Sequence, residues 1–522
     1  MRPPIVWSVA GSDSGGGAGL QADLRAFDAL EVHGCTAVAA LTAQNSTAVQ
    51  RIEAVSPAML DAQLAALAQD LAPRAIKTGM LGGAEQVHCL VGWVDRLRQQ
   101  QPLALVVDPV WRASSGAALG VGAWREAVIG QLLPRATVIT PNRAEAAWLL
   151  GREAPLADAE VPAAAAALRR LGPAAVVVTG GDASREVSLD WLDSAQARGW
   201  LSLPRVNTQH HHGTGCVFAA SMAAALAHGF CEADASVLGK MATTAALQHG
   251  YAAGQGAGPV RPMRGFARRA GALPGLHAEW PGPAAAFAPL QDRRLGLYAV
   301  VDSADWVERV LRAGVRTVQL RIKEAPRERL SREVERAVRA ARSVQAQLFI
   351  NDHWALAIEH GAYGVHLGQE DLEALSHSGL EMLRQAGLRL GLSTHSYWEV
   401  CRAQALSPSY IACGPIHATT TKDMPWLPQG PDNLAYWCHV LASPVVAIAG
   451  MDEARSHEAV RCGAAGVAVL RGVTQATDPE AAIAGLQQAI ASAAAQPPWP
   501  VPALPRSTLP GPVAAGAPGP IH

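Results

Sequence analysis

The 522-residue chain lacks several features that would assign it to a broad class of protein. It has no excess of either charge, because 43 Lys and Arg residues nearly balance 44 Asp and Glu residues. A protein without a basic field has no general means of holding nucleic acid or anionic lipid, so any anionic ligand must be bound by a local site. We therefore expect small-molecule partners, and neither nucleic acid nor a membrane surface.

Cysteine pairs and long apolar segments are also absent. The eight cysteines are scattered from Cys35 to Cys462 without a CxxC pair, which is typical of a reducing compartment rather than of a secreted disulfide framework. The first residues reach a polar glycine stretch too soon for a signal peptide, and no segment approaches the roughly 20 apolar residues that span a membrane. We expect a cytoplasmic protein, with homo-oligomerisation left open.

Two regions alternate apolar β-type runs with helical stretches, which predicts α/β domains with helix-covered parallel sheets. We expect an N-terminal α/β sandwich over residues 1–265, a linker over 266–292, a C-terminal (βα)8 TIM barrel over 293–492 and a Pro-rich, disordered tail over 493–522. The clearest strand candidates of the first region are Ile5–Ala10, Leu103–Asp108, Thr137–Thr140 and Ala174–Thr179. The second region has about eight short runs, as a closed barrel requires, near Leu297, Val318, Phe349, Val365, Leu390, Ile411, Val446 and Val467.

Polar residues follow most runs of the second region, at the strand ends where such barrels carry out their chemistry. In VQLRIK, strand alternation places Gln319, Arg321 and Lys323 on one face, where they can converge on an anion. Asp352 follows the third run and Asp371 follows the fourth. Two converging carboxylates repel each other unless a cation lies between them, and Mg²⁺ with substrate phosphates suits such a pair. The alternative for Asp371 is a helix N-cap.

Further anion-binding groups follow the later runs. Hydroxyl and basic side chains come after the fifth and sixth runs, at Ser393, Thr394, His395, Thr419, Thr421 and Lys422. The turns around Gly450 and Leu470–Gly472 lie where barrels build phosphate cradles from backbone N–H groups. The mouth of the barrel is therefore predicted to bind two anions.

The segments LYAVVD, VQLRIK, FIND, GVHLGQED, LSTHS, GPIHATTTK and VVAIAG resemble thiamine phosphate synthase, in order and over the whole barrel. The resemblance implies that Arg321 and Lys323, with Mg²⁺, stabilise the departing diphosphate of an aminopyrimidine substrate while a thiazole nitrogen captures the cation, without a protein nucleophile. It implies that the aminopyrimidine diphosphate is bound by Gln319, Arg321, Lys323, Asn351, Ser393 and Lys422. It further implies Mg²⁺ ligands at Asp352 and Asp371, and a thiazole phosphate site at Thr419, Thr420, Thr421, Gly450, Leu470 and Arg471.

The barrel departs from that family at the thiazole phosphate end. The family usually has paired glycines after the seventh strand and a serine after the eighth, where this chain has Ala449-Gly450 and Arg471. A related barrel, a thiazole tautomerase, is the alternative. We expect a tautomerase to lack the full set of cations and carboxylates that this chain keeps.

The first region carries two glycine-rich turns. GSDSGGGAGLQAD lacks the Gly-Lys-Ser/Thr of a Walker motif. HGTGC opens an Ala-rich helical stretch. This pattern predicts that the backbone N–H groups at the start of the helix form an anion hole for a transferring phosphoryl group. At the positive end of that helix a depressed thiol pKa would let Cys216 act as a base. The alternative is a small buried cysteine that packs under the helix.

Together with LTAQNS, KTGML, DPV and TPNRAE, these turns resemble hydroxymethylpyrimidine and phosphomethylpyrimidine kinase, a ribokinase-like family, over about residues 5–250. The resemblance implies a ribokinase-like fold with ATP as phosphoryl donor. It implies pyrimidine contacts at Asp23, Gln44 and Met80, Mg–ATP contacts at Asn142 and Glu145, and an anion hole with its base at Gly213, Thr214, Gly215 and Cys216. Lys77 is interpreted as structural.

Three lysines common in that family correspond to Ser114, Thr179 and Gln209 in this chain. A hydrogen bond to a charged group contributes about 1.5 to 3 kcal/mol, so each loss could weaken nucleotide binding or transfer about ten- to a hundredfold.

Two other groups of residues are interpreted as structural. His210, His211 and His212 are consecutive, so their side chains point in different directions and a shared metal ion is not favoured. The tryptophans at positions 7, 93 and 111 are expected to pack in cores or on domain surfaces rather than stack on bases.

The two regions support each other, because the first would make the pyrimidine diphosphate that the second consumes. The sequence thus predicts a bifunctional enzyme of thiamine biosynthesis. One alternative keeps the synthase and makes the first region a pyrimidine-binding module that has lost phosphoryl transfer. Another is a regulatory sensor that binds thiamine precursors without turning them over.

Overall fold

The computed structural model describes residues 2–111, 122–181, 185–282, 285–419, 425–493 and 495–513. The chain forms two compact units, one of Met1–Pro281 with Leu509–His522 and the other of Gly282–Thr508. The boundary after Pro281 lies within the linker predicted over residues 266–292. No helix in the described part of the chain is long and apolar enough to cross a membrane.

The first unit is built on one mixed sheet. Its strands are β1 (Ile5–Asp13), β2 (His33–Gln44), β3 (Val49–Ala54), β4 (Ala75–Thr78), β5 (Ala104–Val107), β6 (Val138–Ile139), β7 (Ala175–Val178), β8 (Val187–Asp193), β9 (Arg198–Pro204) and β10 (Gly275–His277). They lie in the order β10-β9-β8-β7-β6-β5-β4-β1-β2-β3. The six strands from β2 to β7 in this order are parallel, and the edge strands pair antiparallel. Each of the four sequence-predicted strands is present.

Helices cover both faces of this sheet. They are α1 (Gly19–Ala29), α2 (Pro57–Asp70), α3 (Ala84–Arg98), α4 (Ala123–Ala127), α5 (Arg143–Leu149), α6 (Val161–Arg169), α7 (Thr214–Ala227) and α8 (Glu232–Gln248), with short helical turns at Val128–Leu132, Leu133–Arg135, Asp158–Glu160 and Phe266–Arg268. On one face α7 packs on β1, β4 and β5, between α1 and α8. It is apolar all round and buried from Val217 onward, as expected of an interior helix.

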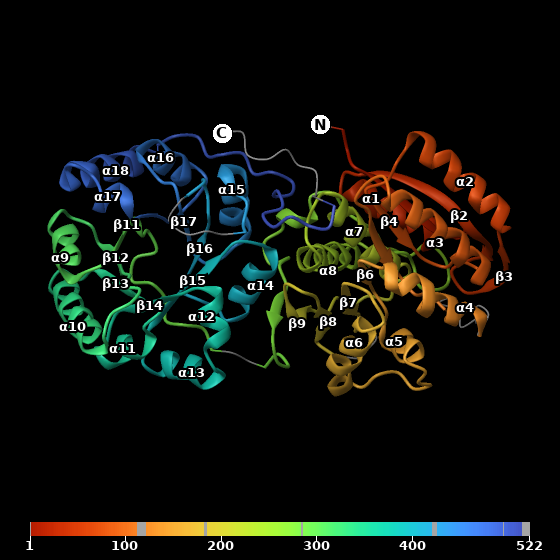
Figure 1. The fold of residues 1–522 in the computed structure, drawn as a ribbon, viewed down its shortest axis with the longest axis horizontal. Helices are drawn as coiled ribbons and strands as arrows, with labels where there is room; N and C mark the ends of the chain where they lie inside the picture. Colours follow the sequence, from red (N-terminus) through yellow and green to blue (C-terminus); the bar gives the residue numbers. More distant parts are fainter. Residues whose placement is uncertain are drawn as a thin grey trace. The chain divides into compact units, whose positions relative to one another are not determined.

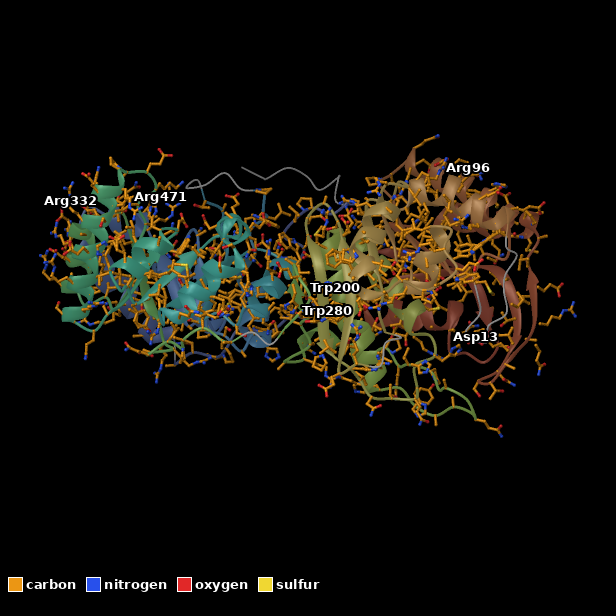
Figure 2. The ribbon with its side chains drawn as sticks, turned by 90° about the horizontal axis from the view of Figure 1, so that it is seen from below. Asp13, Arg96, Trp200, Trp280, Arg332 and Arg471 are labelled. Carbon is orange, nitrogen blue, oxygen red and sulfur yellow. The ribbon has the colours of Figure 1, made fainter. Side chains whose placement is uncertain are left out.

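The predicted linker is partly structured. Its residues Gly275–His277 form β10, which pairs with β9. The rings of Trp200 and Trp280 meet edge to face with centroids 5.0 Å apart (Figure 2). Gly254–Pro289 is rich in glycine and proline, but it still supplies a backbone that can pair with an open sheet edge.

The second unit is a closed parallel barrel with the strands in sequence order (Figure 1). Its strands are β11 (Gly296–Val301), β12 (Thr317–Leu320), β13 (Gln347–Asn351), β14 (Gly364–Leu367), β15 (Arg389–Thr394), β16 (Tyr410–Cys413), β17 (Val445–Ile448) and β18 (Gly466–Val469). All eight contain the residue near which a strand is predicted. The α/β sandwich and the (βα)8 barrel are thus confirmed.

The barrel's helices lie outside this ring of strands (Figure 1). They are α9 (Ala304–Arg312), α10 (Arg327–Ser343), α11 (Trp354–Glu359), α12 (Gln369–Ala374), α13 (His377–Gln385), α14 (Tyr397–Ala405), α15 (Gly430–Val440), α16 (Glu453–Arg461), α17 (Arg471–Thr474) and α18 (Pro479–Ala493). The inner face is partly aromatic, because Tyr298, Phe349 and Tyr410 pack against one another.

The tail differs from the predicted disorder. Residues 495–508 follow α18 in extended form and hydrogen-bond to the barrel, for example from the Trp499 indole to Asp432 at 2.8 Å. Proline-rich composition excludes helix and central strand, but it does not exclude an extended segment held by a folded neighbour. The structure describes the tail only as far as Val513.

Candidate active sites

The glycine turn after β1 in the first unit is organised around Asp13. The Asp13 carboxylate accepts backbone N–H bonds from Gly15, Gly17 and Ala18 at 2.8 to 3.0 Å. It also lies 3.1 Å from His212 Nε2, which belongs to the second glycine-rich turn. Burial acts to raise the pKa of Asp13, but these hydrogen bonds together lower it. Asp13 therefore ties the two glycine turns together as a carboxylate.

The start of α7 makes a close backbone approach to the first turn. Gly213 has a φ of +84°, and a Cβ placed on it would lie 2.1 Å from the carbonyl oxygen of Gly17. Only glycine fits there without strain. Thr214 and Gly215 then open α7, whose first N–H groups have no partners within the helix. This arrangement agrees with the predicted anion hole, although the role itself remains a prediction.

A charged cluster lies beneath these turns, in the parallel strands. The Lys77 ammonium is fully buried, 2.9 Å from Asp23 Oδ2 and 3.9 Å from Asp108 Oδ2. Ser8 Oγ donates to the same Asp23 oxygen at 2.5 Å. Burial opposes the charge of Lys77, but the Asp23 carboxylate raises its pKa above the ordinary range. The structural interpretation of Lys77 suits this geometry.

The prediction that the helix start lowers the thiol pKa of Cys216 is wrong. Loss of solvation raises the pKa of Cys216 to about 12, Lys77 opposes this rise, and the carboxylates of Asp23 and Asp108 add to it. The sequence places Cys216 at the N-terminus of a helix, but it does not show that the thiol is desolvated and lies near the carboxylates of Asp23 and Asp108. Cys216 is a protonated thiol at neutral pH.

The pyrimidine contacts predicted for the first unit are Asp23, Gln44 and Met80, and Asp23 belongs to this cluster. Asp23 is fully buried, and its Oδ1 atom has no hydrogen-bond partner among the described residues. Gln44 Nε2 lies 3.3 Å from His212 Nε2. A Cβ on Gly11 would lie 2.4 Å from the Met80 methyl group, so Met80 covers the end of β1.

The predicted Mg–ATP residues have a local structural role. Asn142 and Glu145 form a reciprocal capping box at the start of α5, with bonds of 2.9 and 2.8 Å. Thr179 bridges to Asn142 from the neighbouring strand. Gln209 is exposed. Ser114 lies outside the described residues.

The three consecutive histidines diverge. His210 Nδ1 accepts from Gly258 N, whereas His212 faces Asp13. The described residues contain no group of three or more His, Cys, Asp or Glu side chains arranged to hold a metal ion. Trp7 is fully buried, Trp93 donates to Asp61, and Trp111 stacks on Trp148, so these rings pack within the fold.

Three of the predicted charged residues, Arg321, Asp352 and Asp371, lie close together at the mouth of the barrel. Asp352 and Asp371 end neighbouring strand–loop connections and are close enough to hydrogen-bond each other. Burial and the nearby Asp371 raise the pKa of Asp352 to about 6, and Arg321 acts against this rise. Asp371 Oδ2 also accepts from Gly368 N at 3.0 Å at the start of α12. The ligand and N-cap interpretations of Asp371 are therefore compatible.

These two carboxylates fit a magnesium ion. When two neighbouring acidic groups in a partly buried site are both ionised, a cation between them relieves their repulsion. Mg²⁺ is held by one or two carboxylates with substrate phosphate oxygens and water, so it does not need a third acidic ligand. Asp352 adopts a positive φ of 62°, which turns its side chain out of the strand direction.

A buried polar chain lies under the predicted pyrimidine site. Gln319 Nε2 donates to Tyr298 OH at 3.2 Å, and Tyr298 OH lies 2.8 Å from Tyr410 OH. His366 Nδ1 lies 2.7 Å from Tyr410 OH, and its Nε2 lies 2.9 Å from Ser393 Oγ. The chain thus connects two predicted substrate residues, Gln319 and Ser393, through the interior.

Sequence reasoning missed three members of this chain, Tyr298, Tyr410 and His366. Burial lowers the pKa of His366 to about 4, so its imidazole is neutral and can accept one hydrogen bond while it donates another. One signal was available, since a histidine within an otherwise apolar strand run such as GVHL needs a buried partner. The two tyrosines looked like ordinary strand residues.

The remaining predicted residues that the structure describes lie at or beyond the carboxyl ends of the strands. Asn351 is buried, Arg321 is half-buried and Lys323 is exposed. Ala449 and Gly450 both have positive φ angles, of 82° and 69°. Leu470 caps α17, and the exposed Arg471 begins it. Thr419 is described, whereas Thr420, Thr421 and Lys422 lie outside the described residues.

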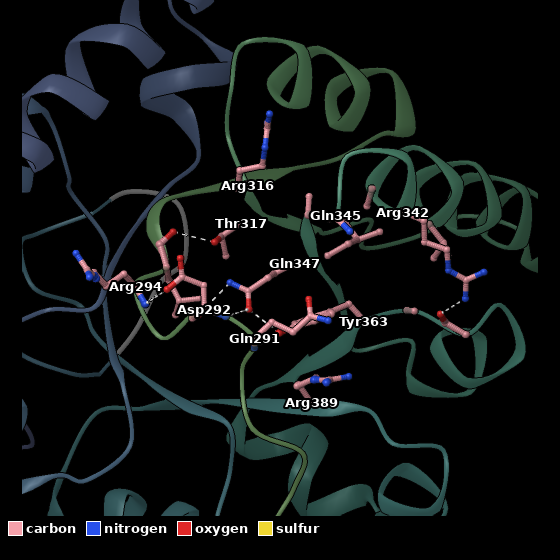
Figure 3. A pocket seen from close by; sticks show the side chains of 17 residues that line it. Gln291, Asp292, Arg294, Arg316, Thr317, Arg342, Gln345, Gln347, Tyr363 and Arg389 are labelled. Carbon is pink, nitrogen blue, oxygen red and sulfur yellow. Dashed lines mark hydrogen bonds between the residues drawn. The ribbon is translucent and has the colours of Figure 1, made fainter.

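A cavity of about 700 Å³ lies at the other end of the barrel. It is lined by residues at the beginnings of strands, including Thr317, Gln347 and Arg389 (Figure 3). Because barrel chemistry takes place at the carboxyl ends of the strands, this cavity is separate from the predicted site.

A mixed sheet with an amide-lined helix start and a barrel with opposed charges at its mouth define a two-domain transferase. Family models match residues 13–261 as phosphomethylpyrimidine kinase and residues 297–473 as thiamine monophosphate synthase. The chain is 50% identical over 202 residues to the thiamine-phosphate synthase of Neisseria meningitidis, covering 97% of that protein and 38% of this chain. It is 49% identical to that of Serratia proteamaculans, covering 94% of that protein and 39% of this chain.

Through its barrel the chain belongs to the thiamine-phosphate synthase family, and it is a bifunctional transferase that joins this synthase to a phosphomethylpyrimidine kinase domain. Solved structures similar to the first unit include a Staphylococcus aureus pyridoxal kinase with ADP, at 31% identity and a TM-score of 0.45 over 50% of this chain and 93% of that one. Another is the Clostridium difficile phosphomethylpyrimidine kinase, at 31% identity and a TM-score of 0.40 over 45% of this chain and 96% of that one.

The kinase match spans the first glycine turn, the buried cluster and the HGTGC turn. The alternative in which the first unit only binds pyrimidines therefore has no support. The tautomerase alternative is likewise unsupported, because the barrel matches the synthase family.

Proposed function

We propose that the first unit phosphorylates hydroxymethylpyrimidine phosphate with Mg–ATP, and that the barrel condenses the resulting diphosphate with thiazole phosphate. The observation that carries the proposal is the arrangement at the barrel mouth, where Arg321 lies beside the paired carboxylates of Asp352 and Asp371. Such a site holds a metal–diphosphate complex and stabilises the charge that develops on the departing group.

In the first unit, we assign the pyrimidine to Asp23, Gln44 and Met80. The free oxygen of Asp23 is a buried acceptor, which suits the amino group of an aminopyrimidine. The anion hole of residues 213–216 would hold the transferring phosphoryl group. Cys216 would accept a substrate proton only as the thiolate, so the proton that its thiol holds at rest must first leave to water. Asn142 and Glu145 would serve ATP through the α5 start that they cap.

In the barrel, bound Mg²⁺ would neutralise the diphosphate and thereby make it a better leaving group. Asp352 and Asp371 would hold the ion, and Arg321, Lys323 and Lys422 would bind the diphosphate oxygens. Gln319, Asn351 and Ser393 would orient the aminopyrimidine ring. The His366–Tyr410–Tyr298 chain keeps Gln319 and Ser393 in fixed rotamers.

The thiazole phosphate would bind at the loops after β16 to β18. We assign it to Thr419, Thr420, Thr421, Gly450, Leu470 and Arg471. Arg471 would supply a guanidinium where a serine is usual, which adds charge to the cradle of backbone N–H groups. We also propose a cytoplasmic location, which suits the use of ATP and Mg²⁺ and the free thiols of all eight cysteines.

A bypass experiment tests the assignment of both sites. The full chain is supplied with hydroxymethylpyrimidine phosphate, Mg–ATP and thiazole phosphate, and thiamine phosphate is measured. Cys216→Ala should abolish this coupled synthesis but leave synthesis from preformed pyrimidine diphosphate intact, whereas Asp352→Asn should abolish both. Arg332→Ala, which removes an exposed arginine of α10, is the matched control. Undiminished coupled synthesis by Cys216→Ala would remove the proposed base.

A further inference from the structure

The segment of residues 495–508 forms an ordered strap along the barrel, after the part that matches the synthase family ends at residue 473. At its beginning, Trp499 N donates to Arg461 O at 2.9 Å, and the Trp499 indole donates to Asp432. Arg461 Nε donates in return to Pro497 O at 3.0 Å. Prolines restrict the free chain, so ordering this segment costs less entropy than ordering a flexible one.

The middle of the strap is fixed to α15 by a buried asparagine. Asn433 is 1% exposed, and its amide binds both backbone groups of Arg506: Oδ1 accepts from Arg506 N at 2.7 Å, and Nδ2 donates to Arg506 O at 2.9 Å. The Arg506 guanidinium also donates to Gln429 O at 3.2 Å. A reciprocal pair of this kind sets the register of the strap.

The end of the strap contacts two loops at the carboxyl ends of strands. Thr508 is 4% exposed, and its carbonyl accepts from Leu427 N at 2.7 Å. Its hydroxyl donates to His395 O at 2.6 Å. His395 follows β15, and Leu427 belongs to the loop between β16 and α15. Thr508 therefore joins these two loops.

The same two loops meet through a second buried residue. Gln429 is 1% exposed, and its amide donates to His395 O at 3.2 Å and to Gly414 O at 3.4 Å. The His395 ring stacks on Trp426, with centroids 5.1 Å apart and planes 7° from parallel. Thr508 thus adds a third tie to the junction between two loops. One follows β15, the strand that contains Ser393, and the other follows β16 and contains Thr419.

We infer that Thr508 and Arg506 are positioning residues for the synthase reaction, through the loops after β15 and β16. This inference rests on the proposed function of the barrel mouth. Loops that are already held in place lose less conformational freedom when substrate binds, so the tie favours binding of the aminopyrimidine diphosphate. The strap contacts backbone at the loop junction, not substrate, so its loss raises KM and leaves the chemical step at saturation largely intact.

The test uses the full chain with Thr508→Val and Arg506→Ala combined, which removes both side-chain donors but keeps the volume of Thr508. We expect the KM for pyrimidine diphosphate to rise about tenfold and kcat to change less than about twofold, because two hydrogen bonds that hold the loops are lost. Kinase turnover on the same chain should not change.

Matched controls separate positioning from general stability. Thr477→Val with Arg332→Ala removes an exposed threonine and an exposed arginine elsewhere on the barrel and should keep the wild-type KM. With Arg506 intact, Thr508→Ser keeps the hydroxyl donor and should keep the wild-type KM, whereas Thr508→Val alone should raise it. An unchanged KM in the double variant, or a lower melting temperature with no change in KM, overturns the inference. A wild-type chain without synthase turnover would instead refute the proposed function.

Discussion

The buried cluster of the first unit yields a prediction that depends on an ion pair. Lys77→Met removes a charge but keeps an unbranched side chain of similar length. Lys77 and Asp23 are both fully buried, with 2.9 Å between Nζ and Oδ2, and Asp108 lies 3.9 Å from the ammonium. The substitution leaves two carboxyl groups in an apolar interior without their counterion.

The expected loss follows from desolvation. Breaking a buried pair by removing one partner costs about 3 to 5 kcal/mol, because the remaining charge is uncompensated. A domain is stable by only about 5 to 15 kcal/mol, so the first unit should lose a large part of its stability. The kinase activity should fall with it, whereas the barrel should keep its own stability.

The loss should depend on pH with a defined sign. Without Lys77, the folded-state pKa of Asp23 and Asp108 rises further above the unfolded value, so the folded state binds protons that the unfolded state does not. Stability of the variant is then greatest below the unfolded pKa of about 4 and falls as pH rises through the folded values. The deficit at pH 8 should exceed that at pH 5.

Hydrogen–deuterium exchange measures this stability separately in each unit. Peptides from β1 and β4 report on the first unit, and peptides from β12 and β13 provide the internal reference. Lys323→Met, which removes an exposed lysine, is the matched control. Asp23→Asn combined with Lys77→Met should recover part of the loss. A deficit under about 1 kcal/mol at pH 8, or a deficit that is the same at both pH values, would refute the reasoning.

Two further predictions concern single residues. Because burial raises the pKa of Cys216 to about 12, its thiolate fraction at pH 8 should be about a thousandfold below that of an ordinary thiol. Iodoacetamide should therefore label Cys216 far more slowly than Cys89. Equal labelling rates at pH 8 would contradict this prediction. Ala449 has a φ of +82°, where a Cβ costs about 1 kcal/mol. Ala449→Gly should therefore stabilise the barrel by up to about 1 kcal/mol, as measured by urea unfolding. A destabilised variant would show that the conformation is not strained.

Periodicity located the strands well in both units, because parallel strands are short apolar runs bounded by polar turns. It missed β10, since three residues of a glycine- and proline-rich segment carry no pattern of their own. It also missed the ordered strap, whose structure comes from hydrogen bonds to Asn433 and Leu427 rather than from its own composition. Segments that order only against a neighbour are not visible in local sequence.

The candidate sites divide in the same way. Motif order named Arg321, Asp352 and Asp371, and the structure brings these three together. Motif order did not reveal the hydrogen-bonded chain from Gln319 through Tyr298 and Tyr410 to His366, because those residues lie on separate strands. The pKa of Cys216 was predicted in the wrong direction for this reason: the helix start is local, but the nearby carboxylates come from α1, at Asp23, and from the residue after β5, Asp108.

The sequence by itself determined the strand and helix pattern, the two-domain plan and the charged residues of the barrel mouth, because those depend on periodicity and on motifs within single segments. Only the tertiary structure decided which charges are buried together, which thiol stays protonated, and where the tail lies. These properties depend on solvation and on distances between residues far apart in the chain, and both are set when the strands and loops are packed.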